Sequence, residues 1–324
     1  MKSYKWLLCA ALAAGASFHA AATDFPARGK TIRLVVGLPA GGPSDAQARV
    51  VAAELQKELG STVVVDNKPG ASMMLASLDV ARAAPDGYTL LYTPSSAMAQ
   101  VPHTLASVQF DPFKDFTPIS VGGLGPLVLV VHKSLAINSV KELVAYAKAH
   151  PGKLNYASFG TGTSSHLYGL MFAKQAGIDI VHIPYKGSND VAKDFISSQV
   201  QMQFATAPSA LGLVKAGAGH IIGLAAPKRT ELLPGLATMA EQGITGVDIE
   251  SWIGFFGPAN MPPEVVSRLN AALVKVLALP QVKEEFRRGA WEAMGSTPAE
   301  FAGALRTSYD QWGKLVAQVG FKRE

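Results

Sequence analysis

The chain has 324 residues, a formal net charge of +5 and a charged fraction of only 16%. Its lysines and arginines are spread out without a basic run, which argues against nucleic acid as a partner. A chain of this length exceeds what one hydrophobic core usually serves, so we expect two lobes.

The amino terminus predicts export. Two lysines among the first five residues precede an apolar, alanine-rich run over 6–18, and small residues follow at 20–22. This order is typical of a secretory signal peptide, so we assign residues 1–22 to a cleaved leader and expect a periplasmic mature protein. The run is too short to cross a bilayer. Because Cys9 is the only cysteine and lies in this leader, the mature chain would hold no disulfide and no cysteine ligand or nucleophile.

Strand-like apolar runs alternate with helical patterns along most of the chain, which predicts an α/β fold with parallel layers. The first part predicts strands at 31–38, 62–65 and 88–92 and helices at 45–59 and 73–83, with Asp45 as a possible N-cap. After the glycine-rich segment 122–126, strands are predicted at 127–131, 155–158, 181–184, 200–206 and 221–225, and helices at 139–148 and 164–175. Longer helices follow at 262–277, 280–288 and 298–319, and the last has an apolar stripe that we expect to pack on a core.

These elements divide the chain into two predicted lobes. Lobe 1 would comprise residues 23–123 and 228–324, and lobe 2 would comprise residues 124–227. The chain would cross near 122–126 and return between 226 and 251, so that the carboxyl-terminal helices pack on lobe 1.

Two stretches combine a short strand, a glycine-rich turn and the start of a helix. The first turn is Pro39-Ala40-Gly41-Gly42, followed by Ser44, and the second runs from Ser158 through Gly160, Thr161, Gly162 and Thr163 to Ser164. Such a turn directs backbone N–H groups and the positive end of a helix dipole at one point, so each could hold an anion. One such turn is also explained as a tight strand–helix connection. Two of them suggest a carboxylate held between two lobes, with both sets of amides in one cleft.

Hydroxyl side chains gather at the predicted carboxyl ends of strands, where α/β folds place ligands. They are Ser95, Ser96, Ser158, Thr161, Thr163 and Ser164. Each one alone is also explained by a turn or N-cap role. Neither glycine turn matches a nucleotide-binding motif, because the third glycine is missing and no Gly-Lys-Ser/Thr follows. A small organic anion is therefore favoured over a nucleotide.

The sequence offers little for catalysis. The histidines that remain after the leader form no metal-ligand spacing. His166 could face a ligand, or it could cap or pack its helix. The run from Gly162 to His166 lacks the closing glycine of a nucleophile elbow and puts serine and histidine side by side, where helix neighbours face different directions. A hydrolase remains a third alternative, and we expect no catalytic residue, no metal and no cofactor.

Several motifs, taken in order, resemble those of the periplasmic substrate-binding proteins of tripartite tricarboxylate transporters, the Bug family, over nearly all of the mature length. They include Thr31 to Val36 with Ala40-Gly41-Gly42, Asp66-Asn67-Lys68-Pro69-Gly70-Ala71, Ala84-Pro85-Asp86-Gly87-Tyr88-Thr89-Leu90, the segment from Asn155 to His166, His182-Ile183-Pro184-Tyr185-Lys186-Gly187, Thr238, Glu241-Gln242-Gly243, Trp252, Gly254 and Thr297-Pro298-Ala299-Glu300-Phe301. The resemblance implies a type II periplasmic-binding-protein fold, in which two α/β lobes close on a small carboxylated ligand in an interlobe cleft without catalysis.

The resemblance also implies where the ligand binds. The family's contacts fall on Pro39, Ala40, Gly41, Gly42 and Ser44 in one lobe, on Ser158, Gly160, Thr161, Gly162, Thr163 and Ser164 in the other, and on Ser95 and Ser96. Ala205 and Thr206 stand where many relatives have an aspartate, the natural partner of a ligand ammonium group. We therefore expect a di- or tricarboxylate or an aromatic carboxylate rather than an amino acid. The implied role is a monomer that presents this ligand to membrane transporter subunits; the alternative is a ligand-responsive partner of a membrane sensor.

Overall fold

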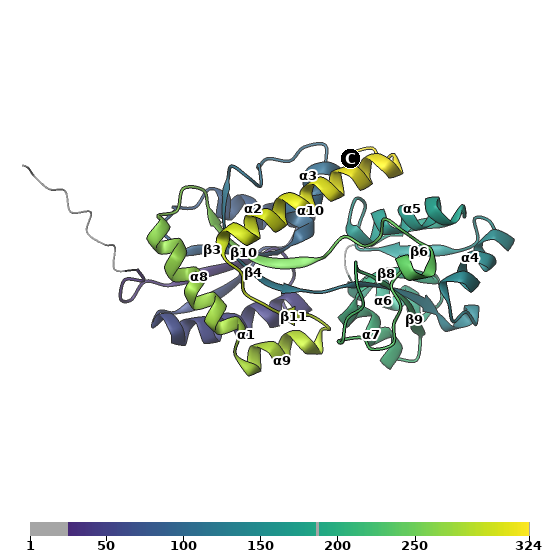
Figure 1. Cartoon of the computed structure of the whole chain (residues 1–324), viewed down its shortest axis with the longest axis horizontal. Helices are drawn as coiled ribbons and strands as arrows, with labels where there is room; N and C mark the ends of the chain where they lie inside the picture. The colour runs from purple at the N-terminus through teal and green to yellow at the C-terminus, as the bar shows by residue number, and fades with distance from the viewer. Residues whose placement is uncertain (1–24, 186–187, 324) are drawn as a thin grey trace, which may run out of the picture.

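The computed structural model describes residues 25–185 and 188–323 (Figure 1). The leader predicted over 1–22, and Lys186 and Gly187 of one motif, lie outside these residues. Within the described residues the strands form two mixed sheets, one in each half of the molecule, and helices surround both (Figure 1).

The first sheet is built from two distant parts of the chain. Its order is β11-β4-β10-β3-β1-β2, with β1 at Ile32–Val36, β2 at Val63–Asn67, β3 at Thr89–Pro94, β4 at Phe116–Leu124, β10 at Trp252–Pro258 and β11 at Glu292–Ala293. Strand β1 is parallel to β2 and β3, whereas β10 is antiparallel to β3 and β4. Strand β10 therefore brings a late segment back to the centre of this sheet.

The second sheet lies between these two parts in sequence. Its order is β7-β6-β8-β5-β9, with β5 at Leu127–His132, β6 at Asn155–Ser158, β7 at Val181–Pro184, β8 at Met202–Thr206 and β9 at Gly219–Ala225. Strand β6 is parallel to β7 and β8, but β5 is antiparallel to β8 and β9. The prediction of wholly parallel layers is thus wrong for β5 and β10, because each enters its sheet from the other half of the molecule without a crossover helix that would restore a parallel direction.

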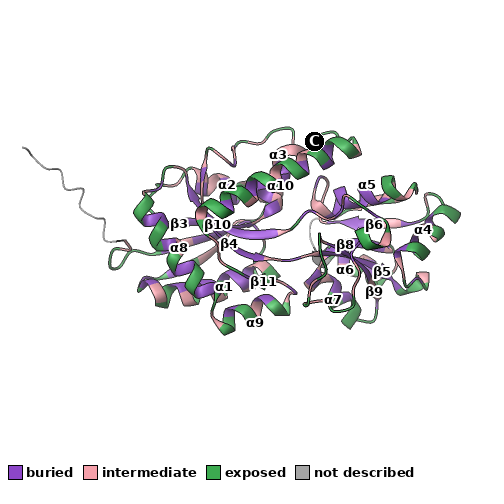
Figure 2. Ribbon diagram, in the orientation of Figure 1, coloured by how far each residue is buried: buried purple, intermediate pink, exposed green. Residues whose placement is uncertain are grey.

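Helices cover both sheets, with their exposed faces outward and the strands buried (Figure 2). Around the first sheet lie α1 (Pro43–Leu59), α2 (Met74–Ala81), the π-helix η2 (Ser96–Gln100), α3 (Val101–Thr104), α8 (Pro263–Leu277), α9 (Pro280–Arg288) and α10 (Pro298–Val319). Around the second lie α4 (Val140–Ala149), α5 (Ser164–Ala176), α6 (Ser188–Ile196) and α7 (Ala207–Lys215), and short 3₁₀ turns occur at Ala71–Met73, Lys133–Leu135 and Ala240–Gln242. In the described ranges no single helix has the length and apolar character to cross a bilayer, and the α8–α9 pair that passes this test together is bent by 72°.

Two neighbouring segments carry the chain between the sheets. Strand β4 runs directly through Gly125 into β5, and the return enters β10 at Trp252. The amide of Gly125 donates to the carbonyl oxygen of Ser251 at 3.0 Å, so the outgoing and returning segments are hydrogen-bonded to each other. The crossing falls where the glycine-rich segment predicted it, while the exact lobe boundaries stay predictions.

The carboxyl-terminal helix α10 also links the two halves (Figure 1). Its predicted apolar stripe is buried at Phe301, Leu305 and Trp312. The indole of Trp312 stacks on Tyr168 of α5 with ring centroids 5.3 Å apart. We expected the carboxyl-terminal helices to pack on the first lobe; α10 does so through η2 and β4, and it also reaches the second half through α5.

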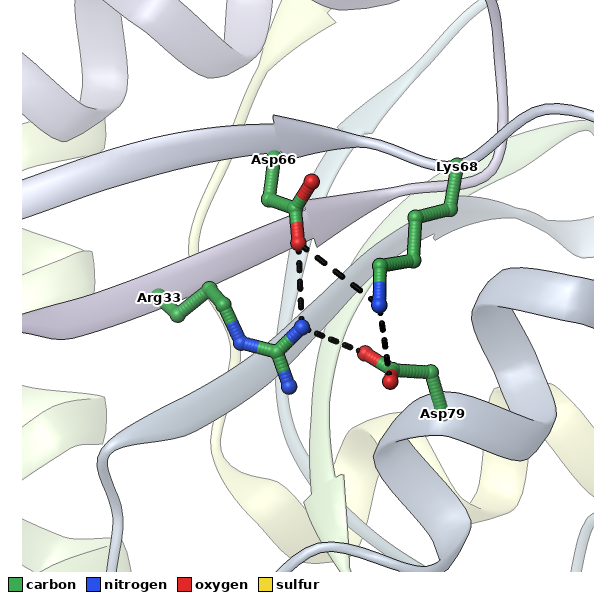
Figure 3. Close-up of polar contacts among 4 residues, drawn as sticks. All are labelled: Arg33, Asp66, Lys68 and Asp79. Carbon is green, nitrogen blue, oxygen red and sulfur yellow. Dashed lines mark hydrogen bonds and ion pairs between the residues drawn. The ribbon is translucent and has the colours of Figure 1, made fainter.

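An ion cluster ties together β1, β2 with the residue after it, and α2 (Figure 3). Arg33 lies 3.0 Å from a carboxylate oxygen of Asp66 and 2.6 Å from one of Asp79, and Lys68 lies 2.8 Å from Asp79. Burial alone would raise the pKa of the Asp79 carboxyl, but the hydrogen bonds from Lys68 and Arg33 outweigh it and lower that pKa. The cluster fixes strand β1, which leads into the first glycine turn, and strand β2, which ends at Asn67.

Candidate functional site

The first glycine turn connects β1 to α1 and is closed by a contact within itself. Gly42 is the N-cap of α1, so the prediction of Asp45 as the N-cap is wrong. Asp45 lies in the first helical turn, where it accepts hydrogen bonds from the Gly41 amide at 2.9 Å and from Arg49 at 2.8 Å. Burial would raise the pKa of Asp45, but these hydrogen bonds outweigh it and the pKa is lowered. The carboxylate is therefore ionised, and its Oδ2 is taken by the turn and Arg49, whereas its buried Oδ1 has no hydrogen bond among the described residues.

Other amides of this turn remain available. Among the described residues, the amides of Ala40, Gly42 and Ser44 have no acceptor. Ala40 is exposed, whereas Gly42 and Ser44 are half-buried. The turn is held from β2 by Asn67, whose amide nitrogen donates to the carbonyl oxygen of Leu38 at 3.0 Å. These amides and the start of α1 make this turn a donor-rich surface.

The second glycine turn, between β6 and α5, repeats the same closure. The amide of Gly162 donates to Nδ1 of His166 at 3.0 Å. Ser158 is fully buried, and its hydroxyl lies 3.1 Å from the Gly160 amide and 2.7 Å from Nε2 of His182. The prediction that both turns aim their amides into one cleft is thus wrong for Gly41 and Gly162, because each of these amides is taken by a side chain four residues later.

Two stacked imidazoles support the second turn from behind. The rings of His166 and His182 lie 3.7 Å apart and are nearly parallel, with an interplanar angle of 4°. Burial lowers the pKa of His182 to about 4, and burial together with repulsion from His182 lowers the pKa of His166 to about 4. Both rings are therefore neutral near pH 7, which leaves Nδ1 of His166 able to accept from Gly162. Of the two roles considered for His166, the structure shows the capping and packing role, since Nδ1 accepts from the Gly162 amide and the ring stacks on His182.

The hydroxyl residues of the predicted site do not all have the same role. Thr163 donates from Oγ1 to the carbonyl oxygen of Gly160 at 2.6 Å, which is a turn contact. Ser164 donates to Oε1 of Gln100 in η2 at 2.6 Å. Thr161 is half-buried, Ser95 is buried just before η2, and Ser96 begins that helix. Among the described residues, Ser44, Ser96 and Thr161 combine some exposure with a side-chain oxygen that makes no hydrogen bond.

The two residues at the end of β8 point to different surroundings. Ala205 is completely buried in the hydrophobic core beneath α6 and α7, so its side chain cannot line a ligand pocket. Thr206 is half-buried at the N-cap of α7 and its hydroxyl lies 2.9 Å from that of Ser209. No carboxylate therefore stands at this strand end.

A cavity of about 280 Å³ lies between the two halves of the molecule beside the first glycine turn. It is lined by Gly41, Gly42, Pro43, Ala46 and Gln47 from the first half, by Pro208 at the start of α7 in the second, and by Glu285, Arg288 and Gly289 from α9 and its end. Gln47, Pro208 and Arg288 are lining residues that sequence reasoning missed. The position of Gln47, one turn into the helix after Gly42, was the available signal.

Gln47 brings an oriented donor to this cavity. It is 3% exposed, and its Oε1 accepts a hydrogen bond from the buried Tyr92 hydroxyl at 3.1 Å. This contact leaves the Nε2 amino group without an acceptor among the described residues. Arg288 lies 3.3 Å from Glu285, so the acidic group that lines the cavity is neutralised by its neighbour.

Nothing in the described part of the chain forms a metal-binding group of three or more His, Cys, Asp or Glu residues. The hydroxyl of Ser164 faces Gln100, and that of Ser165 accepts from the Phe159 amide at 3.0 Å, so neither serine meets a histidine base. The hydroxyl of Ser158 does lie 2.7 Å from Nε2 of His182, but Ser158 is fully buried, so this contact supports the turn and does not present a nucleophile to a ligand.

Two mixed α/β sheets, joined by paired crossing segments and with an open cavity between them, are the architecture of a two-lobed solute-binding protein. The profile of the tripartite tricarboxylate transporter family receptor, TctC, matches residues 47–321. The chain belongs to this family, and the resemblance to the Bug proteins and the type II binding-protein fold are confirmed.

Individual relatives align over nearly the whole chain. Protein BugT of Bordetella pertussis is 32% identical over 310 residues, which cover 95% of this chain and 94% of BugT. The structure of R. palustris Rpa4515 with adipate has a TM-score of 0.85 at 30% identity and covers 92% of this chain and 99% of its own. MatC from Rhodopseudomonas palustris with bound malate has a TM-score of 0.79 at 27% identity and covers 90% and 100%.

Proposed function

We propose that the protein is exported to the periplasm and captures a small di- or tricarboxylate, or an aromatic carboxylate, between its two lobes without chemical conversion. The observation that carries the proposal is the cavity beside the first glycine turn, where the unpaired amide of Gly42 and the Nε2 group of Gln47 supply donors. Backbone amides at a helix start favour a carboxylate over a neutral or cationic ligand.

The same surroundings argue against an α-amino acid. The end of β8 offers Ala205 and Thr206 in place of a carboxylate, and Glu285 at the cavity is paired with Arg288. An ammonium group would therefore lose its water without gaining an unpaired carboxylate from the end of β8 or from α9. The adipate and malate in two structural relatives are both dicarboxylates without an ammonium group, which supports this ligand class.

A calorimetric and thermal-shift panel of matched pairs tests the ligand class. Malate is compared with aspartate, adipate with 2-aminoadipate, and adipate with its uncharged diamide. A ligand at about 100 times its dissociation constant should add roughly 2.7 kcal/mol to the free energy of unfolding. We expect a response to at least one acid and none to its ammonium or amide analogue. A response confined to amino acids, or consumption of the acid on incubation, would contradict the proposal.

Transfer to a membrane transporter is the further step of the proposed function, and the family description supports it. Periplasmic extracts should contain a monomer whose amino terminus follows residue 20 or 22. Crosslinking of that protein in cells, in the presence of its acid, should capture membrane transporter subunits. Capture of a sensor kinase in their place would favour the sensing alternative.

A further inference from the structure

We propose that Gln100 is a positioning residue that holds the second glycine turn from the opposite lobe, so that the turn is complete only when the lobes are together. This inference rests on the proposed function, because it concerns the same cleft. Gln100 belongs to η2 beside the first sheet, whereas its partners belong to the turn that follows β6 of the second sheet.

The side-chain amide of Gln100 makes two contacts across this gap. Its Nε2 donates to the carbonyl oxygen of Gly162, and its Oε1 accepts from the Ser164 hydroxyl at 2.6 Å. Gln100 has no exposed surface, so the amide has no water to replace these partners. Glutamine both donates and accepts through its carboxamide, whereas an ionised glutamate only accepts and leucine does neither. The pair of contacts therefore requires glutamine among these side chains of similar size.

The backbone around Gln100 is built to present this amide. Residues Ser96–Gln100 form a single π-helical turn, closed by the Val101 amide on the carbonyl oxygen of Ser96. Such widened turns place a side chain where an ordinary helix would not, and they concentrate at functional sites. Helix α10 packs against η2, and His103 in α3 contacts the carbonyl oxygen of Tyr309 at 2.9 Å, so the segment is fixed on its own lobe.

A second contact seats the turn on the same segment. Gly162 has a φ of +72°, and a Cβ added there would lie 2.8 Å from Cβ of Thr104 in α3. Glycine therefore allows the turn to touch α3 directly beside the Gln100 contacts. The turn is thus held on one side by His166 of its own helix and on the other by Gln100 and Thr104 of the opposite lobe.

Affinity is the first measurement, with adipate as the probe in titration calorimetry. Gln100→Leu keeps the side-chain bulk but leaves the Gly162 carbonyl oxygen without its donor. Gln100→Glu replaces that donor with an acceptor. Both should weaken adipate binding by about 10- to 100-fold, the range expected when a buried polar group loses its partner. Gln281→Leu, a matched change at an exposed position of α9, should leave the affinity unchanged.

Lobe separation is the second measurement, and it needs no ligand. The mature chain would have no cysteine, so Lys215→Cys on α7 and Lys283→Cys on α9, both exposed, accept a pair of spin labels. Double electron–electron resonance measures the distance between the two labels. This distance should be longer or more broadly distributed in Gln100→Leu than in the labelled protein that keeps Gln100. A purely local packing role would not alter this distance.

Ser164→Ala guards against a variant that fails to fold, because it removes one hydroxyl only. If both residues act through their mutual contact, Gln100→Leu with Ser164→Ala should lose no more affinity than Gln100→Leu alone. Additive losses would show that Gln100 and Ser164 do not act through their mutual contact.

If adipate binds Gln100→Leu as tightly as the unchanged protein, with the same distance distribution, this inference is wrong and the proposed function stands. If no acid of the panel binds the unchanged protein, the proposed function fails, and the distance measurement still decides the role of Gln100.

Discussion

The backbone amide of Gly162 donates to Nδ1 of His166, four residues later, at 3.0 Å. The Gly41 amide makes the same contact with Asp45 at 2.9 Å, so two turns on different sheets share one closure. The closing group differs in charge, since Asp45 is an ionised carboxylate offset by Arg49 and His166 is a neutral imidazole. An anion beside the second turn therefore meets no negative side chain from the residue that closes the turn. The turn keeps this closure only while His166 is neutral, because a protonated Nδ1 cannot accept from the Gly162 amide.

Lowering the pH should therefore destabilise the protein through His166 and His182. Their folded-state pKa values of about 4 lie below the 6.5 of an unfolded histidine, so the unfolded chain binds more protons between these values. The contribution of these two histidines to the free energy of unfolding is full above about pH 6.5 and is lost as the pH falls toward 4. Chemical denaturation at a series of pH values measures this slope.

His166→Asn is the matched variant, because it keeps an acceptor that does not titrate. The slope between pH 6.5 and 4 should shrink in this variant. It should persist in His150→Gln, which changes an exposed histidine at the end of α4. An unchanged slope in His166→Asn would rule out the assigned protonation state.

The two glycines Gly41 and Gly162 should differ sharply in their tolerance of alanine. Both have positive φ, +79° and +72°, so each alanine variant pays about 1–2 kcal/mol for a left-handed residue. A Cβ at Gly41 meets no atom within 4 Å, whereas one at Gly162 lies 2.8 Å from Cβ of Thr104. Thermal unfolding and adipate titration should show the larger loss for Gly162→Ala. Adding Thr104→Gly should recover part of that extra loss, and equal losses in the two single variants would contradict the close contact.

The ion cluster of Figure 3 should contribute modestly to stability. Asp79 is about a quarter exposed and contacts both Arg33 and Lys68, so Asp79→Asn should cost about 1 kcal/mol, near the upper end for partly exposed pairs. Glu284→Gln, which breaks an exposed pair with Arg288 at 3.7 Å, should cost nearly nothing. Denaturation in low salt and in 1 M salt separates the two, because screening should reduce the Asp79 effect. A loss that is independent of salt would point to packing in place of charge.

Much of the fold follows from local patterns, and the misses have a common physical cause. The strand 155–158 and the helices 280–288 and 298–319 were predicted with their observed bounds. Strands β4 and β10 were missed because glycines interrupt their apolar runs. Those glycines serve contacts with distant residues: a Cβ at Gly254 would overlap Phe301, and one at Gly123 would lie 2.8 Å from Phe286. A strand whose side-chain space is filled from elsewhere does not show an alternating pattern.

The candidate site also has parts that a local pattern shows and parts that depend on the tertiary arrangement. The glycine turns were visible because the strand, glycine and helix order is local, while their joint hold on one ligand stays a prediction. Gln47 had a sequence signal in its position one turn after Gly42, whereas Gln100 and Pro208 could not be singled out, since their role depends on which sheets face one another. The same holds for the family motifs, where Asn67 braces the first turn and His182 supports the second. These two motif residues thus shape the site indirectly, and short-range patterns do not show that distinction.

The orientation of Gln47 gives the last prediction. Its Oε1 is held by the Tyr92 hydroxyl at 3.1 Å, so Nε2 is the atom left to donate in the cavity between the lobes. Gln47→Glu replaces this donor with an anion and should weaken adipate binding by about 10-fold or more, since a charged acceptor then opposes a charged acceptor. Gln47→Met, similar in length but without either polar atom, should lose less.

Tyr92→Phe separates the donor from its orientation. The variant keeps Gln47 but frees its amide to rotate, so adipate affinity should fall by a smaller factor, of about threefold, the equivalent of a modest hydrogen-bond loss. Calorimetry on the three variants gives the order Gln47→Glu, then Gln47→Met, then Tyr92→Phe from the weakest binding to the strongest. If Gln47→Glu binds adipate as well as the unchanged protein, the donor does not face the ligand, and the carboxylate must be held by the backbone amides around Gly42 alone.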